Sequence, residues 1–315
     1  MHNSIMNTEA DLQARGLCYR YEDKIAVEAL DISLQAGDIL GFLGPNGAGK
    51  TTTLNMLSGC LRPVAGQIRL CGLDMQRSAR QARAHLGYAP EIPPLYPDLQ
   101  VREYLRFTAQ LRRVTTSQLT AAVQRVLSDY DLQAVAHQRI DTLSKGYRQR
   151  LGLAQAIVHD PDVIILDEPT DGLDPSQIRR TRELIRTLGK KRAVLISSHN
   201  LSEIEATCTR VQILQHGRSV YSARMDDSLE APVSTLVAFQ QTPDLRALSA
   251  LPGIASCEPL SDKRIRLHHQ AGFNTAPLVQ LSSQSQWGLV LLQPETRGLE
   301  DIFIDITTGR TEYAA

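Results

Sequence analysis

Residues 44–52 read GPNGAGKTT and fit G-x-x-x-x-G-K-[ST], the spacing of a phosphate-binding loop. The apolar residues 39–43 before the loop are typical of a buried strand. Residues 53–58 after it predict a helix, with Gly59 as its stop. Strand, glycine-rich loop and helix form the context that such a loop requires, which argues against the alternative of a chance Gly-rich turn.

The loop residues are those that phosphate binding requires. Glycine lets the backbone curl so that successive N–H groups point at phosphate oxygens, and the helix N-terminus adds partial positive charge. We predict that Lys50 reaches the β- and γ-phosphates and that the Thr51 hydroxyl ligates Mg²⁺. The complete predicted set is Gly44, Pro45, Asn46, Gly47, Ala48, Gly49, Lys50, Thr51 and Thr52.

Composition narrows the classes of function. The 315 residues include 34 Lys and Arg against 34 Asp and Glu, so no nucleic-acid partner is expected, although a local basic patch is not excluded. No apolar run approaches the ~20 residues that span a bilayer, and residues 1–11 lack the apolar core of a signal peptide. A membrane role is therefore expected to come through a partner chain. The five scattered cysteines form no C-x-x-C pair, which indicates reduced thiols rather than a disulfide or zinc site.

The first part of the chain predicts a mixture of strands and short helices. Short β-prone runs alternate with turn residues before the loop, which predicts antiparallel strands. After the loop we expect another strand and then a short helix. The predicted strands are 17–19, 25–27, 32–34 and 65–70, and the predicted helix is 77–85.

A helical region follows the proline-rich residues 90–97. Proline at this density excludes helix and marks an exposed, stiff connection. Ser117 is the expected N-cap of the second of three helices. The predicted helices are 101–112, 117–130 and about 144–159.

Alternating strands and helices then predict the main sheet. Apolar runs at 163–166, 193–196 and 211–214 alternate with helices predicted at 176–188 and 201–207. This order indicates parallel strands covered on both faces. The fold class is therefore α/β: a P-loop NTPase core with an antiparallel β subdomain and a helical subdomain.

The pattern changes after Met225. A β-α-β-β-α-β order from residue 233, with a last helix at 299–306, predicts a small C-terminal α+β domain. We expect no metal site at His268 and His269, because adjacent residues of a strand point to opposite faces. The expected domains are 12–224, with a helical subdomain at about 91–160, and 225–315.

Two acidic residues complete the predicted chemistry. Asp167 and Glu168 follow a buried strand, at the edge where an α/β sheet presents ligands. We predict that Asp167 holds Mg²⁺, directly or through water, and that Glu168 polarises the water that attacks the γ-phosphate. Phosphoryl transfer depends mainly on positioning and charge neutralisation, which Lys50, Mg²⁺ and Glu168 supply. The alternative is a surface Asp-Glu pair before a proline turn.

With these residues in place, the sequence resembles the nucleotide-binding subunit of ATP-binding cassette (ABC) transporters over roughly residues 12–223. The most specific sign is LSKGYRQR at residues 143–150, which is similar to the family signature LSGGQ. The resemblance implies that Ser144 and Gly146 bind the γ-phosphate of ATP held by the other subunit. The form S-K-G-x-R-Q-R is similar to that of bacterial cassettes that pair with separately encoded permeases. Taken alone, the stretch is an ordinary Ser-capped helix.

Other residues match the family one by one. Tyr21 fits the aromatic residue that stacks on adenine, with Tyr19 as a rival. Asp174 fits the aspartate that communicates across the dimer, and His199 fits the switch histidine that contacts the γ-phosphate. Glu91 stands where the family has Gln, a residue that contacts Mg²⁺ and the attacking water. Glutamate can perform both contacts but adds negative charge near the phosphates.

The resemblance implies an ATP- and Mg²⁺-dependent ATPase subunit that powers transport, of an exporter class, through a separate integral-membrane permease. A second copy is the expected partner, as a homodimer, and the chain is expected to be cytoplasmic and peripheral on the inner face of the membrane. We expect residues 90–97 and the helices within 101–130 to dock on the permease. One alternative is a soluble cassette ATPase acting on the ribosome or DNA. A regulator without turnover is another, and Glu168 and His199 argue against it.

Overall fold

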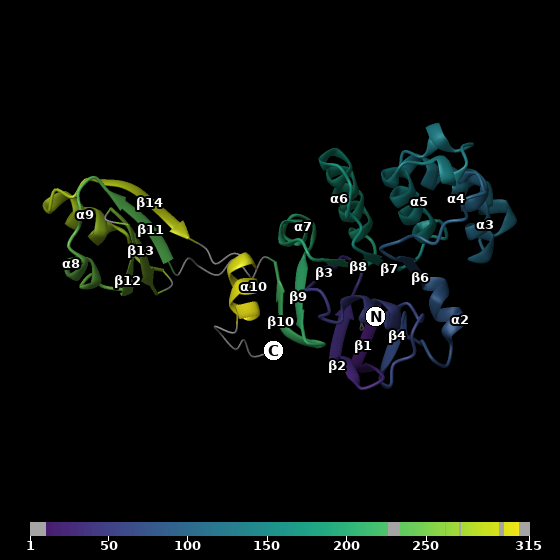
Figure 1. Cartoon of the computed structure of the whole chain (residues 1–315), viewed down its shortest axis with the longest axis horizontal. Helices are drawn as coiled ribbons and strands as arrows, with labels where there is room; N and C mark the ends of the chain where they lie inside the picture. Colours follow the sequence, from purple (N-terminus) through teal and green to yellow (C-terminus); the bar gives the residue numbers. More distant parts are fainter. Residues whose placement is uncertain (1–10, 226–233, 262, 271, 296–298, 309–315) are drawn as a thin grey trace, which may run out of the picture. The chain divides into compact units, whose positions relative to one another are not determined.

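The computed structural model describes residues 11–225, 234–261, 263–270, 272–295 and 299–308. The chain divides into two compact units, and the division falls between Arg224 and Met225 (Figure 1). No helix among the described residues has the length and apolar character needed to cross a membrane.

A six-stranded sheet forms the centre of the first unit. Its order is β10-β9-β3-β8-β7-β6, with five parallel strands and β10 antiparallel at one edge. All residues of β3, β7 and β8 are buried, so the predicted parallel strands covered on both faces are confirmed. The strands are β3 Ile39–Leu43, β6 Leu86–Ala89, β7 Val163–Asp167, β8 Ala193–Ser198, β9 Arg210–Gln215 and β10 Arg218–Arg224.

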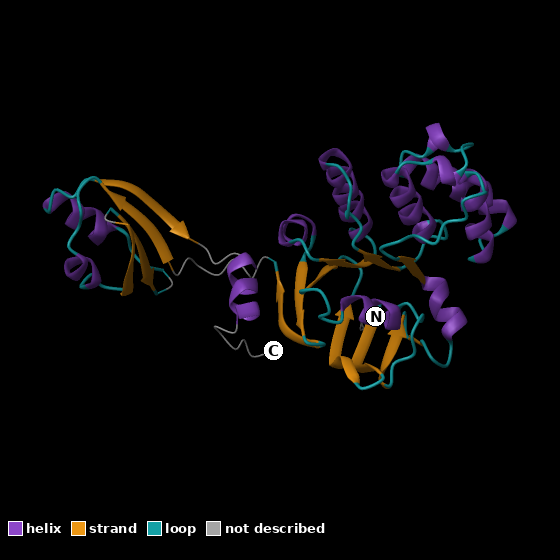
Figure 2. Ribbon diagram, in the orientation of Figure 1, coloured by secondary structure: helices purple, strands orange, loops and turns teal. Residues whose placement is uncertain are grey.

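Helices cover both faces of this sheet. On one side, α1 (Lys50–Leu57) packs with the six-stranded sheet and the antiparallel sheet in one hydrophobic core. On the other side lie α6 (Pro175–Gly189) and α7 (Leu201–Thr207), as Figure 2 shows. Helix α1 begins at Lys50, three residues before the predicted start, because Gly49 in the left-handed conformation serves as its N-cap.

The antiparallel sheet has the order β2-β1-β4-β5. The prediction of separate strands at 25–27 and 32–34 is wrong, because both belong to β2. Ala29 adopts φ 48° within it, and the pairing with β1 shifts register there, so a bulge takes up the irregularity and the strand continues. The strands are β1 Leu12–Tyr21, β2 Lys24–Leu34, β4 Ala65–Leu70 and β5 Leu73–Asp74.

Two helices differ clearly from the sequence prediction, one in the helical region and one before it. The N-cap of α4 is Thr115 and not Ser117, because the Thr115 carbonyl accepts the N–H of Leu119 at 3.0 Å. The predicted helix at 77–85 is shorter and ends as a 3-10 turn. The elements are α2 Ala79–Ala82, α3 Val101–Leu111, α4 Thr116–Asp129 and α5 Lys145–Ile157, with 3-10 turns η1 Arg83–His85, η2 Gln133–Val135 and η3 Ile140–Thr142.

The second unit has the predicted β-α-β-β-α-β order. Its antiparallel sheet runs β12-β13-β11-β14 and carries a core that includes Phe239 and Trp287, whose ring centroids lie 5.8 Å apart. Val233, where the predicted order begins, lies outside the described residues. The elements are β11 Ser234–Phe239, α8 Leu245–Ser249, β12 Ile254–Ser261, β13 Arg264–His269, α9 Ala276–Gln284, β14 Leu289–Glu295 and α10 Leu299–Thr308.

The two adjacent histidines of β13 point to opposite faces, as predicted. The His269 ring is buried, and its Nε2 lies 2.8 Å from the Thr235 hydroxyl. The His268 ring is partly exposed and lies 3.4 Å from the Glu258 carboxylate.

Candidate active site

The phosphate-binding loop lies between β3 and α1, and its shape depends on glycine. Gly47 and Gly49 adopt φ 80° and 103°, in the left-handed region that favours glycine. A Cβ on Gly49 would lie 2.5 Å from the carbonyl oxygen of Ala26, so β2 leaves no room for a side chain there. The loop is therefore fixed by its own backbone conformation and by the neighbouring strand.

Lys50, the first residue of α1, is buried. Its Nζ donates to the carbonyl oxygens of Gly44 at 2.6 Å and Pro45 at 3.3 Å. Burial lowers the pKa of Lys50, and the negative charges of Glu168 and Asp167 oppose this shift. The ammonium group thus lies between the loop and two carboxylates from β7 and the residue after it.

Asp167 is the last residue of β7 and is 3% exposed. The Ser197 hydroxyl from β8 donates to its carboxylate. Burial raises the pKa of Asp167, and the bond from Ser197 opposes this rise. The charge of Lys50 and the hydroxyl of Thr51 also lower the pKa. The carboxylate is therefore held in place by groups from β8 and α1.

Glu168 follows Asp167 in a left-handed conformation, with φ 46°. This conformation costs a residue other than glycine about 1–2 kcal/mol. The Glu168 N–H donates to the Ser197 hydroxyl at 3.1 Å, and the carboxylate lies 2.9 Å from Nδ1 of His199. Burial raises the pKa of Glu168, and the bond to His199 opposes this rise. The geometry holds a carboxylate of raised pKa beside the loop, as a general base requires.

Lys50, Glu168 and His199 line a cavity of about 460 Å³ beside the phosphate-binding loop. It combines a glycine-rich backbone, two ammonium groups, carboxylates and a tyrosine ring, the features needed to bind a nucleoside polyphosphate. The lining residues are Tyr21, Lys24, Ala26, Asn46, Gly47, Gly49, Lys50, Thr51, Thr52, Glu91, Glu168, Asp171 and His199.

Most of the predicted site residues meet at this cavity. The structure also adds three lining residues that the prediction did not include, Lys24, Ala26 and Asp171. Lys24 pairs with Tyr21 across the turn between β1 and β2. The antiparallel strands predicted at 17–19 and 25–27 were therefore the signal that could have found it.

The signature residues do not line the cavity. Ser144 is the N-cap of α5, and its hydroxyl accepts the N–H of Tyr147 at 3.4 Å. Gly146 lies against the terminal amide of the Gln177 side chain, which a Cβ at this position would displace. Asp174 is the N-cap of α6 and accepts the N–H groups of Ser176 and Gln177, each at 3.0 Å.

Lys145 and Asp171 connect the signature segment to the cavity. The Lys145 ammonium lies 3.5 Å from the Asp171 carboxylate, and both side chains are about half exposed. Such an exposed pair contributes little stability, so it can exchange partners at low cost. Asp171 is shared between this ion pair and the lining of the cavity.

The oxygen donors near the loop suit Mg²⁺. The Thr51 hydroxyl donates a hydrogen bond to the buried Asp167 carboxylate. Glu91 adds a second carboxylate at the cavity wall. Hydroxyl and carboxylate oxygens are the ligands that this hard cation prefers. The donor set therefore fits the metal that the sequence predicts.

Loop, buried lysine and paired carboxylates at the strand ends define a P-loop ATPase of the cassette type. The profile of the family described as ABC transporter matches residues 27–171. The chain is 39% identical over 226 residues to Nod factor export ATP-binding protein I of Burkholderia pseudomallei (71% of this chain, 74% of the relative). It is 33% identical over 304 residues to the uncharacterized ABC transporter ATP-binding protein YhcH of Bacillus subtilis (96% and 97%).

Solved structures give the same result. An ATP-binding subunit of an ABC transporter matches with a TM-score of 0.65 and 28% identity, over 69% of this chain and 91% of that one. A dimeric ATP-binding cassette bound to ADP and Pi matches with a TM-score of 0.62 and 19% identity, over 68% and 98%, which supports the fold. The chain belongs to the ABC transporter ATP-binding proteins. It is an ATPase subunit that powers transport, and the alternative of a ribosome- or DNA-acting ATPase is not supported.

The pairing of Glu168 with His199 predicts a pH effect. A general base must be unprotonated, so a raised pKa moves the acid limb of the hydrolysis profile to higher pH. His199 lowers the pKa of Glu168, and its removal lets that pKa rise further. We expect His199→Asn to shift the acid limb of kcat, measured at saturating ATP and Mg²⁺, to higher pH.

The matched control is His137→Asn, which alters an exposed histidine of the helical region. This variant should keep the wild-type profile. An unchanged acid limb in His199→Asn, or a shift to lower pH, would contradict the role assigned to the pair.

Proposed function

We propose that residues 12–224 form the nucleotide-binding domain and that the cavity beside the phosphate-binding loop binds ATP with Mg²⁺. The observation that carries the proposal is the buried Lys50 ammonium facing Asp167 and Glu168 across the loop. Lys50 exchanges its bonds to the loop carbonyls for phosphate oxygens. Thr51, Asp167 and Glu91 hold Mg²⁺, which neutralises phosphate charge.

Tyr21 provides the surface for the base. Its side chain is 48% exposed and lines the cavity, whereas Tyr19 packs against the hydrophobic core. The two rings meet edge to face with centroids 4.9 Å apart, so Tyr19 packs against Tyr21. Tyr21 is therefore favoured over Tyr19 for stacking on adenine, a contact that contributes about 0.5–1.5 kcal/mol.

Glu168 acts as the general base, and His199 orients it and contacts the γ-phosphate. The carboxylate is 13% exposed and the imidazole 60% exposed, so the base is shielded while its partner faces the cavity. Glu168 takes a proton from the attacking water, which becomes the nucleophile at the γ-phosphorus.

A second copy of the chain completes each site. Ser144 is exposed at the N-terminal end of α5, and Gly146 is buried two residues further along the same turn. The Ser144 hydroxyl and the backbone N–H groups of this helix end can bind a phosphate. These residues do not line the cavity of their own chain, which supports a role at the ATP of the partner copy. Asp174, at the start of α6, transmits the state of one site to the other. The assembly is a homodimer that holds two ATP molecules.

Replacement of the base tests this assignment. Glu168→Gln should abolish nearly all hydrolysis because an amide cannot accept the proton from water. It should keep ATP affinity, because Lys50 and the loop backbone are intact, and it should accumulate as an ATP-bound dimer. Phosphate release, ATP titration and sedimentation velocity measure the three effects.

Glu183→Gln, on the exposed face of α6, is the matched control and should hydrolyse ATP at the wild-type rate. Hydrolysis by Glu168→Gln at a rate near that of wild type would show that Glu168 is not the general base. Loss of ATP binding in that variant would instead assign Glu168 to binding.

The chain docks on a separate permease at the cytoplasmic face of the membrane. An apolar surface lies around α3: Tyr96 contacts Phe107 with ring centroids 5.6 Å apart, and Leu111, one turn further along α3, is 65% exposed. Ile92 is 83% exposed and directly follows Glu91, which lines the cavity. The proline-rich segment thus connects the nucleotide to this surface.

Export is the direction we propose, because a relative covering 71% of this chain carries an export function in its name. The relative's substrate is not carried over, because the transported molecule contacts the permease. The second unit is an accessory domain.

A double change, Ile92→Asp with Leu111→Asp, tests docking. Both side chains are well exposed, so stability and basal ATPase should remain close to wild type, while membrane association and transport are lost. Sedimentation with permease-containing membranes measures the association.

Val64→Asp is the matched control, because Val64 is 66% exposed in another part of the same unit. It should leave association intact. Normal membrane association of the double variant, or equal loss in the control, would rule out this docking surface.

A further inference from the structure

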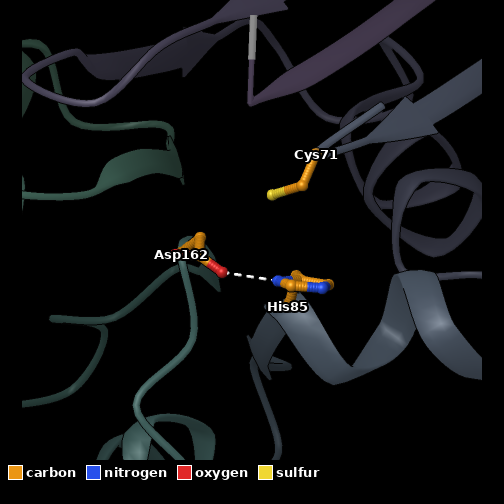
Figure 3. A group of neighbouring side chains, drawn as sticks. All are labelled: Cys71, His85 and Asp162. Atoms are coloured by element: carbon orange, nitrogen blue, oxygen red, sulfur yellow. Dashed lines mark hydrogen bonds and ion pairs between the residues drawn. The ribbon is translucent and has the colours of Figure 1, made fainter. Parts of the chain in front are cut away.

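Three side chains from separate segments meet away from the ATP cavity. Cys71 lies in the turn between β4 and β5, His85 ends η1, and Asp162 directly precedes β7. Their thiol, imidazole and carboxylate ligand atoms all lie within 4.8 Å of one another (Figure 3). Among the described residues, no other group of three such side chains is gathered in this way. We propose that this group binds a zinc ion.

The backbone holds the three residues in place. The Asp162 N–H donates to the His85 carbonyl oxygen at 3.1 Å, and the strands that follow, β6 and β7, pair from Leu86 and Val163 onward. The Cys71 N–H donates to the Asp11 carbonyl oxygen at 2.8 Å. All three ligands are thus attached to strand ends, and a site on strands is more rigid than one on loops.

The turn at Cys71 is unusual for its residue. Cys71 and Gly72 both adopt positive φ, 47° and 76°, at the two-residue connection of a hairpin. Such turns favour Asn, Asp or Gly at the first position, and cysteine pays a conformational penalty there. The turn presents the thiol toward His85 and Asp162 (Figure 3).

The ligand chemistry matches zinc. Thiolate, imidazole and carboxylate are its usual protein ligands, and three of them with a water complete a tetrahedral site. A thiolate and a carboxylate together balance the two positive charges of the ion. Magnesium and calcium prefer oxygen ligands alone, so the sulfur and nitrogen donors discriminate against the cation of the ATP site.

Zinc binding requires the three side chains to adjust: the His85–Asp162 pair must separate slightly, and the Cys71 thiol, which lies within 4.8 Å of both, must approach them. His85 Nδ1 and Asp162 Oδ2 are 2.6 Å apart, a hydrogen-bond distance, whereas two ligands of one tetrahedral zinc ion lie about 3.3 Å apart. The ion therefore replaces the shared proton and separates the pair slightly. The His85 and Asp162 side chains are 40% and 57% exposed, which leaves them room to adjust and gives the ion access.

Zinc at this position would tie the antiparallel sheet to the main sheet. Cys71 belongs to the connection of β4 and β5, while His85 and Asp162 stand at the amino ends of β6 and β7. Asp167 is at the carboxyl end of β7, whereas Asp162 precedes its amino end. The ion and the ATP site therefore lie at opposite ends of the strands of the same sheet. The site therefore stabilises the unit without taking part in hydrolysis.

The test uses the full chain, stripped of metal and without nucleotide. Cobalt(II) serves as a spectroscopic probe, because a cobalt–thiolate bond gives a charge-transfer band in the near ultraviolet. The wild type should show this band at one equivalent of cobalt and lose it when zinc is added. Competition with a chromogenic chelator then measures zinc affinity, and thermal unfolding measures the stabilisation by zinc.

Cys71→Ser should abolish the band and, like His85→Gln and Asp162→Asn, weaken zinc binding at least tenfold. Cys60→Ser, which alters an exposed cysteine of the same unit, should behave as wild type. Circular dichroism and ATP binding verify that each variant is folded. A wild type without the band, a band that survives in Cys71→Ser, or equal zinc affinity in all variants would overturn the proposal. Equal affinity would also place any bound zinc elsewhere, such as at Asp167 and His199.

Discussion

The architecture of the first unit depends on one buried positive charge, the Lys50 ammonium. An ammonium group removed from water is costly unless other charges and dipoles replace its hydration. The carbonyl groups of the loop and the carboxylates of Asp167 and Glu168 supply that replacement. The loop therefore stands between β3 and α1, with the carboxyl end of β7 beside it.

Much of this arrangement could be predicted from the sequence, because the decisive signals are local. The loop spacing, the apolar run before Asp167 and the position of His199 after a strand each place one group at the same sheet edge. The strand β2 was not predicted as one element, since its bulge at Ala29 depends on pairing with β1. Residues from different elements that line one cavity, such as Asp171, can be recognised only from the tertiary fold.

The group of Cys71, His85 and Asp162 is a stronger example of a feature that only the tertiary fold brings together. The sequence has no cysteine pair at zinc-binding spacing and therefore predicts no zinc site, whereas this group takes its side chains from three separate segments. The residues that depart from the family pattern also need the structure to show their surroundings. The sequence shows Glu91 and Lys145, but only the structure places Glu91 at the cavity wall and Lys145 beside Asp171.

The central claim is that Asp167 holds the cation of bound ATP beside Lys50. The most direct test is the affinity of Asp167→Asn for ATP with and without Mg²⁺, measured by titration calorimetry. The account predicts that Mg²⁺ tightens binding to the wild type and loses most of this effect in the variant. Affinity without Mg²⁺ should stay equal or improve, because a negative charge near the phosphates is gone. An equal gain from Mg²⁺ in both proteins would contradict the account.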